Sequence, residues 1–345
     1  MAMPRVTVAM PVFNGARFLA PAIESILGQT LRDFELVVSD DGSSDDSREI
    51  ALAFARRDPR VVLLASERAG IAGNTNRILG QAKGEYFAPM DQDDMAVPER
   101  LARQVAFLDR EKETAVVGGA ARIVDPEGKE LKIRTPASRP GEVAAAMHFS
   151  CAIIHPTSLM RTSAVRAVGG YRTVLPYAQD YDLWLRLMER NAVANLPDIL
   201  LAKREHPKQV TSDWARRPAQ VVAGAIAYLS YMSRQTGGPD IATGDRPLVE
   251  SAAAFIDAYL SRDAALSPAV IHHFSRFVRY APLLTSGPRQ TEHPYSRYLR
   301  RALADGDPRN RARTVWYMLS FFFYNRYRYS NLFQDQGARD RLVAP

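Results

Sequence analysis

Three short polar clusters each follow a run of apolar residues: Pro11-Val12-Phe13-Asn14, Asp40-Asp41-Gly42-Ser43 and Asp91-Gln92-Asp93-Asp94. The apolar runs before them are the length of buried strands. In open α/β sheets, ligands bind outside the carboxyl ends of the strands. Three such clusters at successive strand ends therefore predict one ligand site along an edge of a sheet.

The cluster Asp91-Gln92-Asp93-Asp94 places three carboxylates in four residues. Their mutual repulsion at neutral pH is relieved by a cation, and oxygen ligands of this kind suit Mg²⁺ or Mn²⁺. The chain has no GxGxxG after its first strand and no GxxxxGK[ST], so the usual backbone grips on phosphate are missing. A divalent metal is the other way to hold a diphosphate. The alternative is an Asp-rich turn that caps a helix starting near Pro98.

The elements that must position these clusters alternate in type. Strand patterns cover 6–10, 34–39, 61–65 and 86–90, and helix patterns cover 18–27, 47–55, 74–82 and a segment from Pro98. Strands separated by helices of about ten residues predict a doubly wound, mostly parallel α/β sheet.

The pattern changes twice further along the chain. From Ala115 it predicts two short strands (116–117 and 122–124), a hairpin turn at 125–128, helices at 163–168 and 179–190, and an edge strand at 199–203. After Trp214 the strand signals vanish and helical patterns take over. We therefore expect an α/β domain that holds the ligand site over 1–212 and an all-helical, Arg-rich region over 213–345.

Composition narrows the class of protein. Of 345 residues, 46% are hydrophobic and 24% are charged, which is typical of a globular protein. A single cysteine, Cys151, excludes an intramolecular disulfide and a cysteine-rich zinc site. There is no apolar run long enough to span a membrane and no secretory signal pattern, so we expect a cytoplasmic protein.

The net charge of +7 is concentrated at one end of the chain. From Asp213 onward there are 18 arginines and 11 acidic residues, whereas the preceding part is neutral. Such a segment favours an anionic partner, either nucleic acid, acidic lipid or acidic glycan, and the alternative is a solvated helical surface.

Within this region, Arg309 to Tyr329 holds nine mostly apolar residues, 316–324, between arginine clusters. That length fits an interfacial helix in peripheral contact with the inner face of a membrane. The alternative is a helix that packs on the catalytic domain or on a second subunit, which would give a homo-oligomer.

The ordered set of segments resembles family 2 glycosyltransferases, which have the GT-A fold. The resemblance covers about residues 4–212 and lies in Val8 to Asn14, Ala22 to Thr30, Phe34 to Ser43, Lys83 to Phe87, Asp91 to Asp94, His155-Pro156, Gly169 to Tyr171 and Gln179 to Trp184.

The resemblance implies a role for each matching position on the donor side. The nucleoside pocket and its loops would comprise Pro11, Val12, Phe13, Asn14, Asp40, which accepts a hydrogen bond from the base, and Asp41, which supports the loop. Asp91 would face the donor ribose or sugar, and Gln92 is expected among the donor-binding residues. Asp93, with Asp94, would hold Mn²⁺ or Mg²⁺ on the diphosphate.

Positive side chains near the diphosphate are less well defined by the resemblance. The family often has Arg-Asn where this chain has Thr75-Asn76, so Arg68 and Arg77 are the nearest candidates. Further on, Lys203 to Val210 resembles a segment that closes over the donor. There Arg204 would neutralise the diphosphate, and His206 would bind metal or phosphate, although a lone histidine is more often structural.

Asp180 matches the catalytic base of the family. The family has a glutamate before it, whereas this chain has Gln179. The loss of one neighbouring negative charge would leave Asp180 less basic.

Together these features predict a metal-dependent inverting glycosyltransferase. Its donor would be a nucleoside-diphosphate sugar, with UDP or dTDP favoured, and its acceptor a hydroxyl of a glycan or lipid-linked glycan. Two alternatives are weaker. A sugar-nucleotide pyrophosphorylase would need a Gly-rich basic loop after the first strand, and a nucleic-acid-binding protein would leave the acidic clusters unexplained.

Overall fold

The computed structural model describes residues 3–65, 67–139, 141–206, 217–243, 248–260 and 267–280. They fall into two compact units. The first comprises 3–173 and 179–206, and the second comprises 174–178 and the described residues from 217. The expected boundary at 212 lies outside the described residues, so a domain division at that position stays a prediction.

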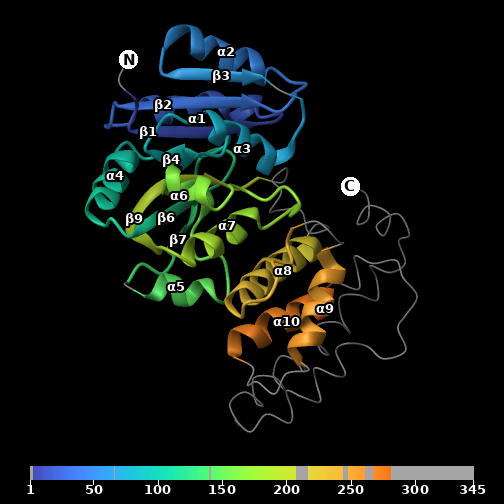
Figure 1. Cartoon of the computed structure of the whole chain (residues 1–345). Coiled ribbons are helices and arrows are strands. Elements are labelled where there is room, and N and C mark those ends of the chain that lie inside the picture. The colour runs from blue at the N-terminus through green and yellow to red at the C-terminus, as the bar shows by residue number, and fades with distance from the viewer. Residues whose placement is uncertain are drawn as a thin grey trace. The chain divides into compact units, whose positions relative to one another are not determined.

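One half of the first unit is a parallel sheet. Its strands are β1 (Val6–Val12), β2 (Phe34–Asp40), β3 (Val61–Ala65) and β4 (Tyr86–Pro89), in the order β3-β2-β1-β4 (Figure 1). All three neighbouring pairs are parallel. The register pairs Val12 with Asp40, so the loops that follow β1 and β2 start side by side. The predicted doubly wound, mostly parallel α/β fold is confirmed.

Helices α1 (Ala16–Leu27), α2 (Ser47–Arg57), α3 (Gly70–Gln81) and α4 (Arg100–Arg110) connect or follow these strands. Helix α1 buries Leu19, Ala22, Ile23 and Ile26, which recur at the spacing of one helical face. Helix α3 begins four residues before the predicted start at Asn74.

The other half of the sheet is mixed. It contains β5 (Met95–Ala96), β6 (Thr114–Val124), β7 (Glu130–Arg134), β8 (Leu159–Arg161) and β9 (Ala192–Arg204). The order continues β4-β8-β6-β9-β5, and β7 pairs with β6 as the predicted antiparallel hairpin.

Two sequence predictions about this half were wrong. The short strands expected at 116–117 and 122–124 are parts of the one strand β6, and the expected edge strand at 199–203 belongs to β9, which lies between β6 and β5. Gly118-Gly119 interrupts the apolar pattern because β9 approaches too closely for side chains. A Cβ at Gly118 would lie 2.5 Å from Asn195 Oδ1, and one at Gly119 would lie 2.5 Å from Leu200 Cδ1.

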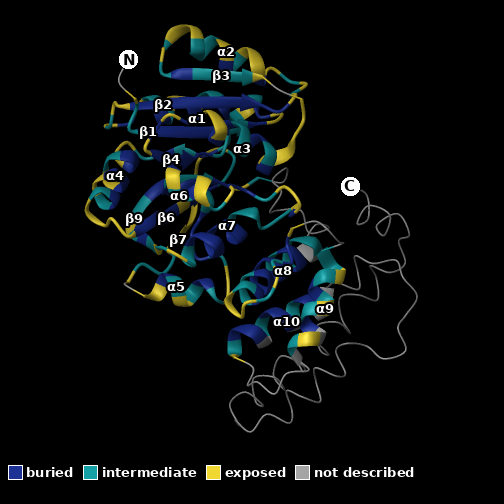
Figure 2. Cartoon of the chain, viewed as in Figure 1, coloured by how far each residue is buried: buried dark blue, intermediate teal, exposed yellow. Residues whose placement is uncertain are grey.

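The remaining helices of the first unit are α5 (Glu142–Met147), the 3₁₀ turn η1 (His155–Thr157), α6 (Thr162–Ala167) and α7 (Gln179–Met188). Figure 2 shows that burial follows the strands β1 and β2 and the inner faces of the helices. Trp184 of α7 and Tyr86 of β4 are among the largest fully buried side chains.

The second unit is helical in the described residues. It contains α8 (Arg217–Gln235), α9 (Leu248–Leu260) and α10 (Pro268–Tyr280). The rings of Tyr228 on α8 and His273 on α10 stack with centroids 4.0 Å apart. None of the described helices has the length and apolarity needed to cross a bilayer. Residues 309–329 lie outside the described residues, so membrane contact and a homo-oligomer through this segment stay predictions.

Gly84, just before β4, lies where the backbone leaves no room for a side chain. A Cβ there would lie 2.3 Å from the backbone nitrogen of Thr7. We expect Gly84→Ala to lower the free energy of unfolding by about 1–3 kcal/mol, because strand β1 must shift. Urea denaturation measures this.

Gly80, near the end of α3, is the matched control, since a Cβ there meets nothing within 4 Å. Gly80→Ala should raise the stability by about 0.5–1 kcal/mol through helix propensity. Equal effects of the two substitutions would contradict the steric explanation.

Candidate functional site

The loop after β1 is tied to the acidic loop by a side-chain amide. Gln92 Oε1 accepts a hydrogen bond from the Phe13 amide at 2.9 Å, and Gln92 Nε2 donates to the Phe13 carbonyl at 3.1 Å. Phe13 is 37% exposed, and the Arg68 guanidinium lies 4.4 Å from the centroid of its ring. The structure therefore brings Phe13, Arg68 and Gln92 together, whereas Pro11 and Val12 lie within β1.

The loops after β1 and β2 are also bound to each other. The backbone N–H of Asn14 donates to Ser43 Oγ at 2.9 Å, and Asn14 Oδ1 accepts from the Ser44 amide at 2.8 Å. Asn14 has a φ of 49°, a left-handed conformation that asparagine tolerates better than most residues. These bonds hold the two polar loops together at the carboxyl end of the sheet.

The neighbouring aspartates Asp40 and Asp41 are both buried but differ in their contacts. Asp40 accepts a hydrogen bond from the Ser43 amide at 3.2 Å. Asp41 accepts from the amides of Ala69 at 2.7 Å and Gly70 at 2.9 Å, which are the first donors of α3. A carboxylate at a helix N-terminus stabilises that end, which explains the early start of α3.

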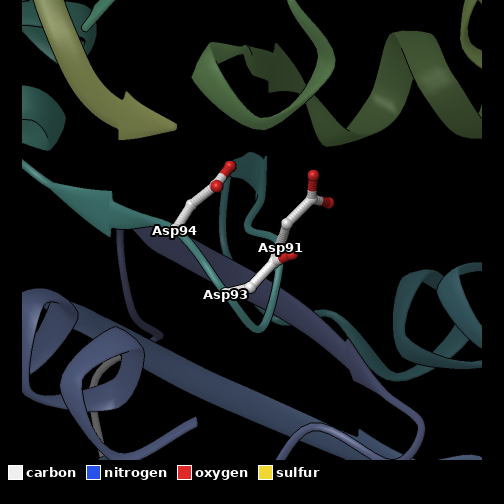
Figure 3. A group of neighbouring side chains, drawn as sticks. All are labelled: Asp91, Asp93 and Asp94. Carbon is white, nitrogen blue, oxygen red and sulfur yellow. The ribbon is translucent and has the colours of Figure 1, made fainter. Parts of the chain in front are cut away.

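The acidic loop runs from β4 to β5. Carboxylate oxygens of Asp91, Asp93 and Asp94 all lie within 4.8 Å of one another. Figure 3 shows the carboxylates of Asp91 and Asp94 pointing to the same side of the loop. Asp94 is fully buried, and its Oδ2 has no hydrogen-bond donor. This oxygen-rich cluster fits a hard divalent cation such as Mg²⁺ or Mn²⁺.

The end of β9 lies against this loop. His206 Nε2 is 2.8 Å from Asp93 Oδ2, and the His206 ring contacts that of Phe18 at a centroid distance of 5.2 Å. The Arg204 guanidinium donates to the carbonyls of Asp93 at 3.1 Å and Asp125 at 3.2 Å. Arg204 therefore links the backbone of the acidic loop to that of the turn after β6.

Lys203 is a site residue that sequence reasoning missed. Its Nζ lies 3.5 Å from Asp91 Oδ2 and 3.7 Å from Asp94 Oδ2. Burial raises the pKa of the Asp94 carboxyl well above its usual range, Lys203 opposes that rise, and the charges of Asp91 and Asp93 add to it. The sequence does contain a sign of this role, because Lys203 directly follows the apolar run Leu200-Leu201-Ala202. A lysine buried in such a strand needs an acidic partner.

Asp180, the expected base, lies in the first turn of α7. Its Oδ1 accepts a hydrogen bond from the Tyr181 amide at 2.8 Å, and Cys151 Sγ lies 3.7 Å from its Oδ2. Burial raises the pKa of the Cys151 thiol well above its usual range, and the charge of Asp180 raises it further. The thiol is therefore protonated and donates to the carboxylate.

His155 and Tyr171 lie near both Asp180 and the acidic loop. His155 Nε2 is 2.9 Å from the Tyr171 hydroxyl. Burial lowers the pKa of His155, while the charges of Asp180 and Asp91 oppose that shift. Burial also raises the pKa of Tyr171, and the same two carboxylates add to the rise. A neutral imidazole and a neutral phenol thus share the electrostatic environment of Asp91 and Asp180.

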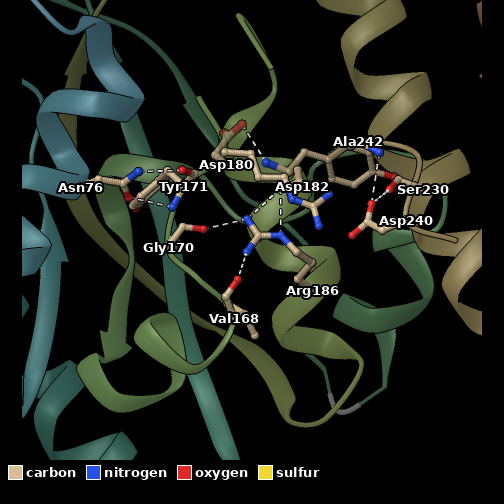
Figure 4. A network of polar contacts seen from close by, with 12 residues as sticks. Asn76, Val168, Gly170, Tyr171, Asp180, Asp182, Arg186, Ser230, Asp240 and Ala242 are labelled. Carbon is tan, nitrogen blue, oxygen red and sulfur yellow. Dashed lines mark hydrogen bonds and ion pairs between the residues drawn. The ribbon is translucent and has the colours of Figure 1, made fainter. Parts of the chain in front are cut away.

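Hydrogen bonds to its backbone groups hold Tyr171 in place (Figure 4). Asn76 Nδ2 donates to the Tyr171 carbonyl at 2.7 Å, and Asn76 Oδ1 accepts from the Tyr171 amide at 2.8 Å. Arg186 donates to the carbonyls of Val168 at 2.6 Å and Gly170 at 2.8 Å, and pairs with the buried Asp182 at 2.7 Å.

Asn76 belongs to the Thr75-Asn76 pair that departs from the family pattern. The structure gives it a positioning role, whereas the guanidinium of Arg77 lies 3.1 Å from Asn74 Oδ1.

Comparisons with known proteins bear on the family and the fold of this chain. The family model described as "Glycosyl transferase family 2" matches residues 7–169. EpsE of Bacillus subtilis, which is named as a glycosyltransferase, is 36% identical to this chain over 208 residues. The match covers 59% of this chain and 73% of EpsE.

Two solved structures are similar in fold. S. aureus TarS in complex with UDP-GlcNAc has a TM-score of 0.55 and 18% identity, covering 81% of this chain and 82% of that chain. The mannosyltransferase PcManGT from Pyrobaculum calidifontis, in complex with GDP-Man and Mn²⁺, has a TM-score of 0.50 and 18% identity, covering 95% and 88%.

The fold and the sequence relatives define a GT-A glycosyltransferase. This chain belongs to glycosyl transferase family 2. The alternatives of a pyrophosphorylase and a nucleic-acid-binding protein are thereby set aside.

Asn76→Ala tests the backbone clamp on Tyr171. We expect the free energy of unfolding to fall by about 1–3 kcal/mol, because two hydrogen bonds with mostly buried groups are lost. Urea denaturation measures the change. Asn191→Ala is the control, since Asn191 makes one local side-chain bond to the Leu187 carbonyl. If Asn76→Ala costs no more than this control, the clamp is unimportant.

Proposed function

We propose that this enzyme transfers a sugar, with inversion, from a nucleoside-diphosphate donor to a hydroxyl of a glycan or lipid-linked glycan, and that it needs a divalent metal. The observation that carries the proposal is the convergence of Asp91, Asp93 and Asp94 within 4.8 Å at the carboxyl edge of the sheet. The Phe13 loop, tied to this cluster through Gln92, lies beside it.

The donor side of the proposal uses the loops after β1 and β2. The half-exposed Phe13 ring and the Arg68 guanidinium above it form a flat, positively charged surface suited to a nucleotide. Asp40 would accept a hydrogen bond from the base. The bound UDP-GlcNAc of TarS and GDP-Man of PcManGT support a nucleoside-diphosphate sugar as the donor class. The preference for UDP or dTDP rests on the sequence resemblance.

The metal would be held by Asp93, with Asp91 beside it in the acidic loop and His206 in contact with Asp93. When bound, Mn²⁺ or Mg²⁺ supplies positive charge that stabilises the leaving diphosphate. The Mn²⁺ in PcManGT supports this assignment. The chain's own contribution is the geometry: Gln92 fixes the loop to Phe13, and Arg204 holds the Asp93 carbonyl from below.

The acceptor side of the proposal uses Asp180. A sugar hydroxyl is a weak nucleophile at neutral pH, so a base must take its proton as the new glycosidic bond forms. The Asp180 carboxylate takes this proton, while the bond between the anomeric carbon and the diphosphate breaks. The Tyr181 amide and the Cys151 thiol hold both carboxylate oxygens in place, so the base is oriented before the acceptor arrives.

Asp180→Asn separates chemistry from binding. We expect the transfer rate to fall by about 10²–10⁴-fold, because the amide cannot take a proton but keeps the shape of the side chain. Nucleotide affinity should stay unchanged. The transfer rate is measured with the donor found by a thermal-shift screen of nucleotide sugars with Mn²⁺, and affinity by calorimetry.

The exposed Asp33→Asn provides the control for this variant, and it should match the wild type in both measurements. Normal transfer by Asp180→Asn would show that another group is the base.

Asp93→Ala tests the metal site. The wild type should bind UDP or GDP more tightly with Mn²⁺ than with a chelator, since a cation held by Asp93 would supply positive charge for the diphosphate. In Asp93→Ala the two affinities should become equal by calorimetry. If the chelator leaves the nucleotide affinity of the wild type unchanged, the proposed metal dependence is wrong.

A further inference from the structure

Lys203 is the positively charged group that the structure places inside the acidic cluster. It lies near the end of β9, where the register with β6 pairs it with Ile123 and fixes its position. Its side chain is 19% exposed, and its Nζ makes ion pairs with both Asp91 and Asp94. The reaction as described above does not use it.

Asp94 differs from the other two acids in its surroundings. Its side chain is fully buried, whereas Asp91 and Asp93 are partly exposed. The Arg204 amide donates to Asp94 Oδ1 at 2.9 Å, while Oδ2 receives no hydrogen bond and has Lys203 Nζ at 3.7 Å. A buried carboxylate without such a cation would be strongly unfavourable.

The other nearby cation, Arg100, is engaged elsewhere. Its guanidinium donates to the carbonyls of Pro89 and Ser158, both at 3.0 Å. Asp93 has a partner of a different kind, since His206 Nε2 lies 2.8 Å from its Oδ2. The cluster therefore contains two separate pairs: Asp94 with Lys203, and Asp93 with His206.

We propose that Lys203 is a positioning residue that serves as the resident cation of the acidic loop, with Asp94 as its counter-ion and not a metal ligand. The metal site is then left to Asp93, with Asp91 shared between the lysine and the metal. This division rests on the proposed metal-dependent function, but the pairing of Lys203 with Asp94 can be tested without it.

The consequence is that the loop is organised before any substrate arrives. Lys203 removes part of the repulsion among the three carboxylates, so the loop keeps its shape in the metal-free enzyme. The metal then enters a site with lower negative charge than the sequence alone indicates. Without Lys203, Asp94 would be a buried acid without an ion-pair partner.

A double-mutant cycle on the full chain tests the pairing. Lys203→Met should lower the thermal midpoint in chelator by about 5–15 °C, because Asp94 is left unpaired. Adding Asp94→Asn to Lys203→Met should recover most of this loss. Lys203→Arg should lie near the wild type. Lys132→Met, which breaks an exposed pair with Glu205, is the control and should change the midpoint little.

The second measurement concerns the metal. Uptake of Mn²⁺ in the presence of UDP or GDP is followed by the EPR signal of free Mn²⁺. The double variant should bind Mn²⁺ within about tenfold of the wild type, a difference of about 1.4 kcal/mol. The Asp93→Ala variant should not bind it.

Two results would overturn the proposal. One is a double variant no more stable than Lys203→Met alone. The other is a stable double variant that has lost Mn²⁺ binding, which would make Asp94 a metal ligand. If the wild type itself takes up no Mn²⁺, the proposed metal dependence fails, and the thermal cycle still decides whether Lys203 is the counter-ion of Asp94.

Discussion

The candidate site depends on how the protein offsets the repulsion among three carboxylates, which lie within 4.8 Å of one another in the loop after β4. Like charges at this distance are tolerated only when cations and donors surround them. The protein supplies Lys203 between Asp91 and Asp94, and the Arg204 amide to Asp94. The rest of the fold brings these groups from β9 to a loop more than a hundred residues earlier in the chain.

Much of this was predictable from the sequence, for a physical reason. The strand and helix periods of the first hundred residues are strong because parallel strands are buried on both faces and the helices on one. The polar clusters at the carboxyl ends of these parallel strands were therefore expected to lie close together. Asp41 was expected to support the loop after β2, and in the structure its carboxylate accepts hydrogen bonds from the first amides of α3.

What the sequence did not disclose depends on long-range pairing. The pattern around Gly118-Gly119 suggested a break because a glycine pair looks the same in a turn and in a close strand contact. The strand at 199–203 was expected at an edge of the sheet but has a neighbour on each side, β5 and β6. Both neighbours are distant in sequence, so the local pattern did not indicate them. Lys203 was overlooked for the same reason: its acidic partners lie on another element. Arg204 was expected at the diphosphate; its guanidinium donates to the carbonyls of Asp93 and Asp125, and its role toward a phosphate stays a prediction.

Strand β5 has only two residues, Met95 and Ala96, which pair with Ala202 and Leu201 of β9. It follows Asp94 directly, and Lys203 follows Ala202 directly within β9. Because side chains alternate across a strand, one inserted residue in either segment would turn Lys203 or Asp94 to the opposite face of the sheet. The spacing along both segments is therefore as tightly constrained as the charges they carry, and only paired changes in length would preserve the match.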